Sequence, residues 1–386
     1  MIKKTNYYSW TLNNLPDGCK QCVKGEKLVM FVTGICPRQC SYCPLSEQKK
    51  DQDVIFANER QLASEKEIAA MVAEARTCRS KGAGFTGGDP LTKIDRTCRY
   101  IRILKKEFGK KFHIHLYTSM DLLSEKNLQK LNDAGLDELR FHPELFTDRL
   151  WSKKSLFYDD KGKRKYRFKI GIEIPVLPKK FEVTKRVVDY FASSVDFINL
   201  NELEISDAEA FKIKHVKTKN AQYYGALGSE ETALQILEYL SKSYSKLNVH
   251  YCTCKLKDKV QLGERLKRRA KNTAESFDLI TDDGTILRGA IYLPQTRPGF
   301  GYKKRLAETK DKEKIIKRLV TAQNKIIKEF AIPKEYMGID TQKLRLITNI
   351  GIVRELSGAL KQRGLVPAIV EQYPTYDQME VDVEFL

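Results

Sequence analysis

Short apolar runs alternate with amphipathic stretches through residues 28–254. The apolar runs have the length of β-strands and occur at 28–32, 82–86, 113–119, 138–142, 166–175, 197–203 and 247–252. Between them, stretches such as 64–75 and 122–134 repeat apolar residues every three or four positions, which is the period of an α-helix with one buried face. Strands that alternate with helices are typical of parallel β-α-β units. The pattern predicts an α/β fold with a partial or near-closed parallel (β/α) barrel.

The pattern changes after residue 275. A hairpin is expected at 277–293, with an Asp-Gly turn, and a linker rich in Pro, Gly and Lys follows it. Two amphipathic helices, at 308–330 and 341–363, precede two final strands at 366–373 and 379–386. We therefore expect an appended C-terminal α+β domain. The resulting organisation is a leader (1–27), the barrel (28–254), a basic helix (255–275) and the C-terminal domain (276–386).

The overall composition is that of a globular protein. The chain has 386 residues, of which 41% are hydrophobic and 31% charged. The first residues do not resemble a signal peptide, and we find no apolar run of about 18 residues. We therefore expect a cytoplasmic protein that does not enter a membrane. In that compartment, the nine cysteines are expected to be metal ligands or free thiols rather than disulfides.

Three closely spaced cysteines follow the first apolar run. Cys36, Cys40 and Cys43 are spaced C-x3-C-x2-C, and Gly34 separates them from the strand at 28–32. Three thiolates suit an iron–sulfur cluster better than a structural zinc ion, because structural zinc takes four protein ligands. A cluster with three protein ligands also leaves one iron open for a substrate or cofactor. The alternative is three buried thiols that cluster without a metal.

With Tyr42 before the last cysteine, this motif resembles the signature of the radical S-adenosylmethionine (SAM) enzymes. Over about residues 25–250 the chain resembles proteins related to pyruvate formate-lyase activating enzyme. The resemblance implies a [4Fe–4S] cluster on the three cysteines, with SAM bound to the fourth iron and Tyr42 near the adenine. It also implies an electron donor such as ferredoxin or flavodoxin. The reduced cluster would cleave SAM to a 5′-deoxyadenosyl radical, which removes hydrogen from a substrate.

Further candidate cofactor-binding residues follow the later strands. Gly87, Gly88 and Asp89 resemble the family's Gly-Gly-Glu motif, which binds the amino group of SAM, although aspartate is shorter than glutamate by one methylene. Glycines there would also let the backbone approach a ligand closely. Chemistry in parallel barrels takes place at the carboxyl ends of the strands. The polar residues at these ends are therefore candidates for SAM or substrate contacts, or else ordinary strand residues: Ser119, Arg140, Glu173 and Asn201.

Two more cysteine pairs suggest a second metal site. Cys19 and Cys22 form a C-x2-C pair in the leader, and Cys252 and Cys254 lie near the last strand of the barrel. Each pair is half of a tetrahedral site, so we expect the four to converge on zinc or a second iron–sulfur cluster, with His250 able to replace one ligand. The alternative is two unrelated pairs.

The charge suggests the class of substrate. The formal net charge is +19, and the segment 255–275 is especially rich in Lys and Arg. Such an excess favours polyanionic partners, so the leading hypothesis is a radical SAM enzyme that modifies RNA, either tRNA or rRNA. The alternative is an activase that generates a glycyl radical in a partner protein or otherwise modifies it. A non-enzymatic RNA-binding protein with metal knuckles fits less well, because it would not need the Gly-Gly-Asp motif. Nothing in the sequence indicates an oligomeric state.

Overall fold

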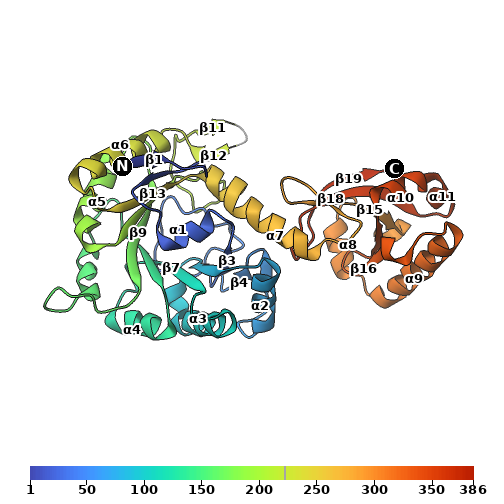
Figure 1. The fold of residues 1–386 in the computed structure, drawn as a ribbon, viewed down its shortest axis with the longest axis horizontal. Coiled ribbons are helices and arrows are strands. Elements are labelled where there is room, and N and C mark those ends of the chain that lie inside the picture. The colour runs from blue at the N-terminus through green and yellow to red at the C-terminus, as the bar shows by residue number, and fades with distance from the viewer. Residues whose placement is uncertain (221–222) are drawn as a thin grey trace. The chain divides into compact units, whose positions relative to one another are not determined.

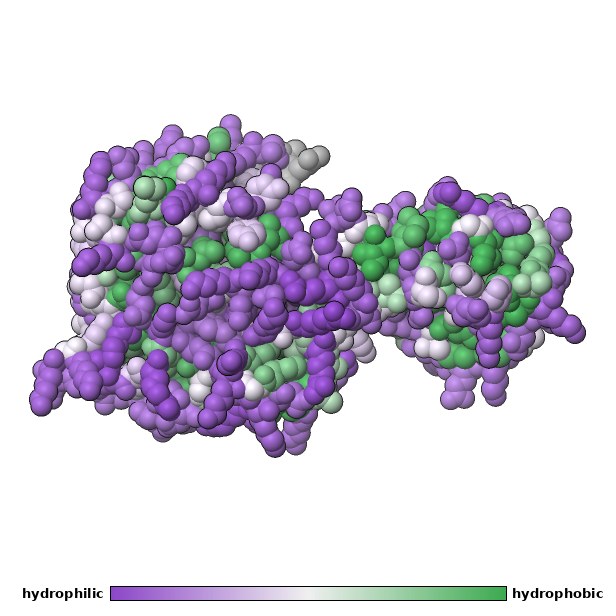
Figure 2. Space-filling view, viewed as in Figure 1, coloured by the Kyte–Doolittle hydropathy of each residue, from purple (hydrophilic) through white to green (hydrophobic). Residues whose placement is uncertain are grey.

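The computed structural model describes residues 1–220 and 223–386, which divide into two compact units, Met1–Arg265 and Leu266–Leu386 (Figure 1). Helix α7 (Gly263–Thr273) contains the boundary between them. No helix in the described part of the chain is both long and apolar enough to cross a bilayer. On the face drawn in Figure 2, hydrophilic side chains cover most of the first unit, whereas the second shows more hydrophobic surface.

The first unit is built on a sheet that has, in the described residues, a continuous block of parallel strands. Short antiparallel strands extend both edges, and the outermost of them, β1 and β5, do not pair with each other in this part of the chain. The predicted barrel is therefore confirmed in its partial form. In spatial order the parallel strands are β3 (Lys27–Phe31), β6 (Gly82–Thr86), β7 (His113–Ser119), β8 (Glu138–His142), β9 (Lys169–Val176), β10 (Phe197–Glu202) and β13 (Asn248–Cys252).

Helices connect the parallel strands and cover one face of the sheet. Alternate strand residues, such as Leu116 and Phe141, are fully buried and belong to the main hydrophobic core. The intervening residues, such as Tyr117 and Arg140, belong to the opposite face because side chains alternate along a strand. The connecting helices are α2 (Ile68–Thr77), α3 (Ile94–Phe108), α4 (Glu125–Ala134), α5 (Phe181–Phe191) and α6 (Ser229–Ser243).

The leader is part of this sheet unit. Strand β2 (Trp10–Leu12) pairs with β13 and with β1 (Ile2–Lys4), so the first residues extend the sheet at its last parallel strand. Helix α1 (Asp17–Cys22) packs on the inner face of the sheet, since a Cβ atom on Gly18 would lie 2.5 Å from Nη2 of Arg140. Figure 1 shows this helix in front of the strands. Such short elements have too few residues to give a periodic signal in the sequence.

Two more pairs of short strands in this unit lie at the other edge of the main sheet or outside it. Strands β4 (Ile55–Ala57) and β5 (Arg60–Leu62) form a hairpin beside β3. Strands β11 (Thr218–Asn220) and β12 (Tyr223–Ala226) form a separate antiparallel pair.

The second unit is an antiparallel sheet with helices, which confirms the predicted α+β class. Strands β14 (Leu279–Ile280) and β15 (Ile286–Tyr292) form the expected hairpin, and α9 (Lys312–Glu329) the first expected helix. The second expected helix is wrong, because 341–363 contains a strand and two short helices. The remaining elements are α8 (Tyr302–Glu308), β16 (Met337–Asp340), β17 (Arg345–Thr348), α10 (Ile350–Glu355), α11 (Ser357–Gln362), β18 (Val366–Gln372) and β19 (Glu380–Phe385).

The error at 341–363 has a simple cause. The apolar residues of β17 are followed at once by those of α10 and α11, and together they imitate the spacing of one long amphipathic helix. Arg345–Thr348 pair with β15 on one side and β16 on the other, and Leu346 is fully buried, so this segment is an inner strand of the sheet.

Candidate active site

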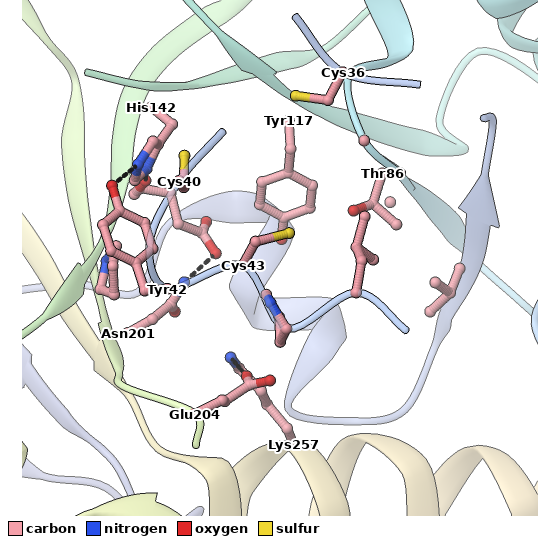
Figure 3. A pocket seen from close by; sticks show the side chains of 18 of the residues that line it. Cys36, Cys40, Tyr42, Cys43, Thr86, Tyr117, His142, Asn201, Glu204 and Lys257 are labelled. Atoms are coloured by element: carbon pink, nitrogen blue, oxygen red, sulfur yellow. Dashed lines mark hydrogen bonds and ion pairs between the residues drawn. The ribbon is translucent and has the colours of Figure 1, made fainter. Parts of the chain in front are cut away.

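A cavity of about 500 Å³ opens at the carboxyl ends of the parallel strands. Cys36, Cys40 and Cys43 all line it, and so do residues at the ends of β6, β7, β8, β9 and β10 (Figure 3). A parallel sheet brings these ends together at one edge, where ligands of α/β proteins bind. The residues drawn there include Thr86, Tyr117, His142 and Asn201.

Gly34 closes the loop that carries the three cysteines. The Gly34 amide donates to the carbonyl of Gln52 at 2.8 Å, and its own carbonyl accepts from the Asp51 amide at 3.0 Å. A Cβ atom on Gly34 would overlap the carbonyl oxygen of Lys49. Only glycine lets the returning chain pack this closely, so this residue sets the shape of the loop.

Arg38 ties the middle of the loop to the strands. Its Nε and Nη2 donate to one oxygen of Asp121 at 3.0 and 2.6 Å, and its Nη1 donates to the carbonyl of His142 at 2.7 Å. Burial would raise the pKa of Asp121, but the Arg38 charge and the hydrogen bonds outweigh it and lower that pKa. The side chains of both partners are largely buried, so a charge-assisted contact of this kind is stronger than a neutral hydrogen bond.

Tyr42 is held by His142. The Tyr42 hydroxyl lies 2.7 Å from Nε2 of His142, while Nδ1 lies 2.8 Å from the carbonyl oxygen of Glu173. Because a carbonyl only accepts, Nδ1 carries the proton and Nε2 accepts from the tyrosine. Burial lowers the pKa of His142 to about 4, which keeps the ring neutral near pH 7. Tyr42 therefore has one fixed orientation in the cavity wall.

A long segment between β10 and β11, residues 203–217, lies against the cysteine loop. The Lys212 amide donates to the carbonyl of Ser41 at 2.6 Å, and Phe211 forms an isolated bridge with Tyr42. The Glu209 amide also donates to the Glu47 carboxylate at 2.7 Å. These contacts hold the segment against the cysteine loop and cover part of it.

The three thiols fit an iron–sulfur cluster in number and kind. They lie on one cavity wall, and burial raises the pKa of Cys36 to about 11. The described residues hold no group of three or more His, Cys, Asp or Glu side chains gathered as for a single metal ion. A cubane does not need such a group, since each of its cysteines binds a different iron. Three thiols carried by one short loop are thus the donor set for a cluster with one open iron.

The two glycines of the Gly87-Gly88-Asp89 turn line the cavity, and the structure shows a second reason why these positions need glycine. A Cβ atom on Gly88 would lie 2.5 Å from the carbonyl oxygens of Gly34 and Ile35, and one on Gly87 would overlap the carbonyl of Thr33. The Gly88 amide donates to the Thr33 carbonyl at 2.7 Å. The turn thus packs directly on the chain that leads into Cys36.

The structure does not place Asp89 and Ser119, two of the residues predicted to bind the cofactor, in the cavity wall. Asp89 is fully buried outside the cavity wall, and its carboxylate accepts from the amide and hydroxyl of Ser119 at 2.9 and 2.7 Å. It also accepts from the Thr118 hydroxyl at 2.8 Å and the Leu91 amide at 2.9 Å. Aspartate at this position joins the ends of β6 and β7, and its shorter side chain suits that contact.

Arg140 is likewise a supporting residue rather than part of the cavity wall. It is 2% exposed, and its Nη1 donates to Glu173 at 2.8 Å while Nε donates to Glu138 at 2.6 Å. Glu173 does line the cavity and also accepts from the amides of Asn199 and Asn201, both at 2.9 Å. Three donors therefore fix the Glu173 carboxylate.

Asn201 offers a free acceptor to the cavity. Its Oδ1 is buried and, within the described residues, has no hydrogen-bond partner. A buried acceptor without a partner costs free energy unless a ligand supplies a donor. Among the residues predicted to bind the cofactor, those in the cavity wall are Tyr42, Gly87, Gly88, Glu173 and Asn201.

In the described residues, the four further cysteines do not form a site for a single metal ion such as zinc, and a second iron–sulfur cluster on them stays a prediction. Cys19 is buried, with Sγ 3.3 Å from the Asn199 amide and 3.5 Å from the Arg140 guanidinium. Cys22 instead lines the cavity. In the described chain, these thiols and those of Cys252 and Cys254 are not arranged around one metal ion.

The expectation that Cys252 and Cys254 share one face of a strand is wrong. β13 ends at Cys252, and Cys254 already lies in the helical segment that follows, so strand alternation does not place the two thiols on one face. The Cys254 amide donates to Glu202 at 2.9 Å. His250, the possible replacement ligand, is buried, and burial lowers its pKa to about 3.

Comparison with known proteins gives the family. A protein from Methanocaldococcus jannaschii, named "Putative glycyl-radical enzyme activating enzyme MJ0021", is 41% identical over 290 residues, which is 74% of this chain and 76% of the relative. Residues 30–201 match the radical SAM superfamily. The chain belongs to this superfamily. For a radical SAM enzyme, the family implies a [4Fe–4S] cluster and SAM, which agrees with the donor set of the cavity.

Other similarities are more limited. A biotin synthase from Shewanella sp. (strain ANA-3) is 30% identical over 132 residues, which is 33% of this chain and 35% of that protein. The crystal structure of HydG, a maturase of the [FeFe]-hydrogenase, is 11% identical, covers 68% of this chain and 69% of its own, and has a TM-score of 0.39. Residues 284–386 match a domain of unknown function, DUF8061.

Several residues of this radical SAM site were missed by the sequence analysis. Tyr117 and His142 lie in β7 and β8, where alternation alone could have placed them beside Arg140. Arg38 lies within the cysteine motif itself. Glu204 and Lys257 line the same cavity from segments far apart in the chain, and no local pattern relates them.

Proposed function

We propose that this radical SAM enzyme is an activase that generates a glycyl radical in a partner protein or otherwise modifies that protein. The observation that carries the proposal is the similarity to the M. jannaschii relative, because it extends over about three quarters of both chains. Two proteins that share this much sequence share the barrel and much of what surrounds it. A partner protein with a glycine as the reacting residue is then the expected substrate.

We expect the residues of the cavity to have different roles in the reaction. Cys36, Cys40 and Cys43 would hold the cluster, which, when bound together with SAM, supplies the electron for cleavage of SAM. Tyr42, fixed by His142, would position the adenine. The other cavity residues bind and orient, and the segment 203–217 covers part of the cysteine loop.

The RNA hypothesis has less support than the activase. It depended on the net charge and on the basic segment 255–275. In that segment Lys257 pairs with Glu204 and Arg265 with Glu59. Four further basic side chains of the segment also have interactions within the protein: Lys259, Lys267, Arg268 and Arg269. The segment is therefore less suited to bind phosphates than its composition suggests.

An anaerobic experiment tests the proposal. The reconstituted enzyme is incubated with SAM and dithionite in an extract of source cells that lack the gene, and the protein fraction is examined by electron paramagnetic resonance. We expect a signal with the splitting of a glycyl α-hydrogen, absent with the Cys40→Ala variant. RNA nucleosides from the same cells are measured by mass spectrometry. A nucleoside modification that depends on the gene, without a protein radical, would contradict the proposal.

A further inference from the structure

Two charged side chains face each other in the wall of the cavity. Lys257 and Glu204 form an ion pair, and each side chain is 28% accessible. Both residues line the cavity, so their accessible surface faces the space above the cysteine loop. Figure 3 shows them together at one side of that space. Ion pairs with accessible surface inside a cavity are in a position to meet a ligand.

The Lys257–Glu204 pair has N–H donors and carboxylate acceptor positions that its own hydrogen bond does not use. An ammonium group has three N–H donors and a carboxylate has about four acceptor positions. Within the described residues, the Lys257 ammonium has Glu204 as its hydrogen-bond partner, and that bond uses one oxygen of the carboxylate. Burial would lower the pKa of Lys257, but the Glu204 charge raises it, so the lysine stays charged. One side of the pair can therefore donate while the other accepts.

Lys257 lies in a π-helix, Leu256–Leu262, which continues into α7. π-helical turns are rare and occur often at functional sites. Gln261 and Arg265 line the cavity from the same side as Lys257, and Arg265 pairs with Glu59. This wall thus contains two cations, each matched by a carboxylate.

The balance of charge indicates the kind of ligand. A wall meant for a phosphate or a free carboxylate would present an accessible unmatched cation, but here Lys257 and Arg265 each have an anion. Lys27 also lines the cavity, but it is buried and donates to the carbonyls of Ala83 and His113. A peptide unit is uncharged and offers one acceptor and one donor, which are the groups that Lys257 and Glu204 together can satisfy. A glycine has no side chain, so a site that selects it must bind the backbone.

We propose that the Lys257–Glu204 pair anchors the backbone of an extended polypeptide substrate. Lys257 donates to a peptide carbonyl, and Glu204 accepts from a nearby peptide N–H. This inference rests on the proposed activase function and names the groups that hold the target segment of the partner. The pair binds the substrate and has no part in binding SAM or the cluster.

The test uses the double variant Lys257→Met, Glu204→Met in the reconstituted holoenzyme. Removing both charges together leaves no unpaired buried charge, and such replacements are often neutral for stability. The probe is N-acetyl-pentaglycine amide deuterated at every Cα, supplied with SAM and dithionite. Transfer of deuterium to 5′-deoxyadenosine is measured by mass spectrometry, and peptide binding by equilibrium dialysis. The control is Lys185→Met, Asp189→Leu, a pair on α5 with similar accessibility (32% and 29%) that does not line the cavity.

We expect wild type and control to transfer deuterium, and the double variant to lose about 10- to 100-fold in kcat/KM for the peptide. Its KM for SAM and its iron content should stay unchanged. Transfer at the wild-type rate by the double variant would overturn the role of the pair. Loss of SAM affinity would also overturn it, by assigning the pair to the cofactor. Absence of transfer and of peptide binding in the wild type would instead contradict the glycyl activase function itself.

Discussion

Replacing Gly88 by alanine should remove the cluster and SAM binding together. The added Cβ would lie 2.5 Å from the carbonyl oxygens of Gly34 and Ile35, closer than any ordinary contact. The chain before Cys36 would have to move, which disturbs the bonds from the Gly88 amide to Thr33 and from the Asp89 amide to Ile35, at 2.7 and 2.8 Å. The cysteine loop begins directly after this point.

The cost can be estimated from the structure. Forcing an extra methyl into a packed site costs about 1–3 kcal/mol. Each disturbed hydrogen bond costs about 0.5–1.5 kcal/mol. With two hydrogen bonds disturbed, we therefore expect the free energy of unfolding of the metal-free protein to fall by about 2–6 kcal/mol. Iron content after reconstitution should fall by more than half, since the spacing of Cys36 from Cys40 and Cys43 is no longer maintained.

The measurements are urea unfolding, iron and sulfide content, and SAM affinity by equilibrium dialysis. The matched control is Gly358→Ala in α11, where the structure has no atom within 4 Å of an added Cβ, so stability should be unchanged or rise by up to about 1 kcal/mol. If Gly88→Ala keeps full iron content and loses only SAM affinity, then glycine is needed for close approach of SAM to the backbone. That result would refute the argument that Gly88 is needed for packing against the chain before Cys36. Unchanged stability would refute it as well.

Three other predictions concern the same unit. Cys40→Ala should abolish 5′-deoxyadenosine formation, because two thiolates cannot hold the cluster, and retained cleavage of SAM would exclude the assigned site. Arg38→Lys should lower iron retention severalfold, since the single nitrogen of lysine cannot replace the three nitrogens of the planar guanidinium that reach Asp121 and the His142 carbonyl from fixed directions; equal retention would show that the loop needs no such anchor. Burial would raise the pKa of Asp17, but Lys169 and a second lysine lower it to about 2, so its stabilising contribution is present above about pH 4 and lost as the pH falls toward 2. Melting temperatures of wild type and Asp17→Asn should therefore differ at pH 6 and converge near pH 2; a constant difference would contradict this assignment.

The sequence alone was sufficient where a property depends on neighbouring residues. Cys36, Cys40 and Cys43 lie within eight consecutive residues, so the sequence shows the motif directly. All three line the same cavity because one short loop carries them. Alternation of strands and helices predicted the parallel sheet because each β-α-β unit is a local pattern with its own period. The sequence analysis also recognised that positions 87 and 88 need glycine for close approach of a ligand. It did not recognise that the glycines also pack against the chain before Cys36.

The tertiary structure decided which polar side chains face the cavity. Asp89 and Arg140 have the residue types expected of ligand contacts, yet their hydrogen bonds go to neighbouring strands. Whether a carboxylate faces a cavity or a neighbouring strand depends on sheet register, which pairs residues far apart in the chain. The ion pair of Glu204 and Lys257 joins segments separated by 53 positions. Only folding brings such groups together, because their contact arises from the packing of a π-helix beside the end of a strand and not from any local pattern.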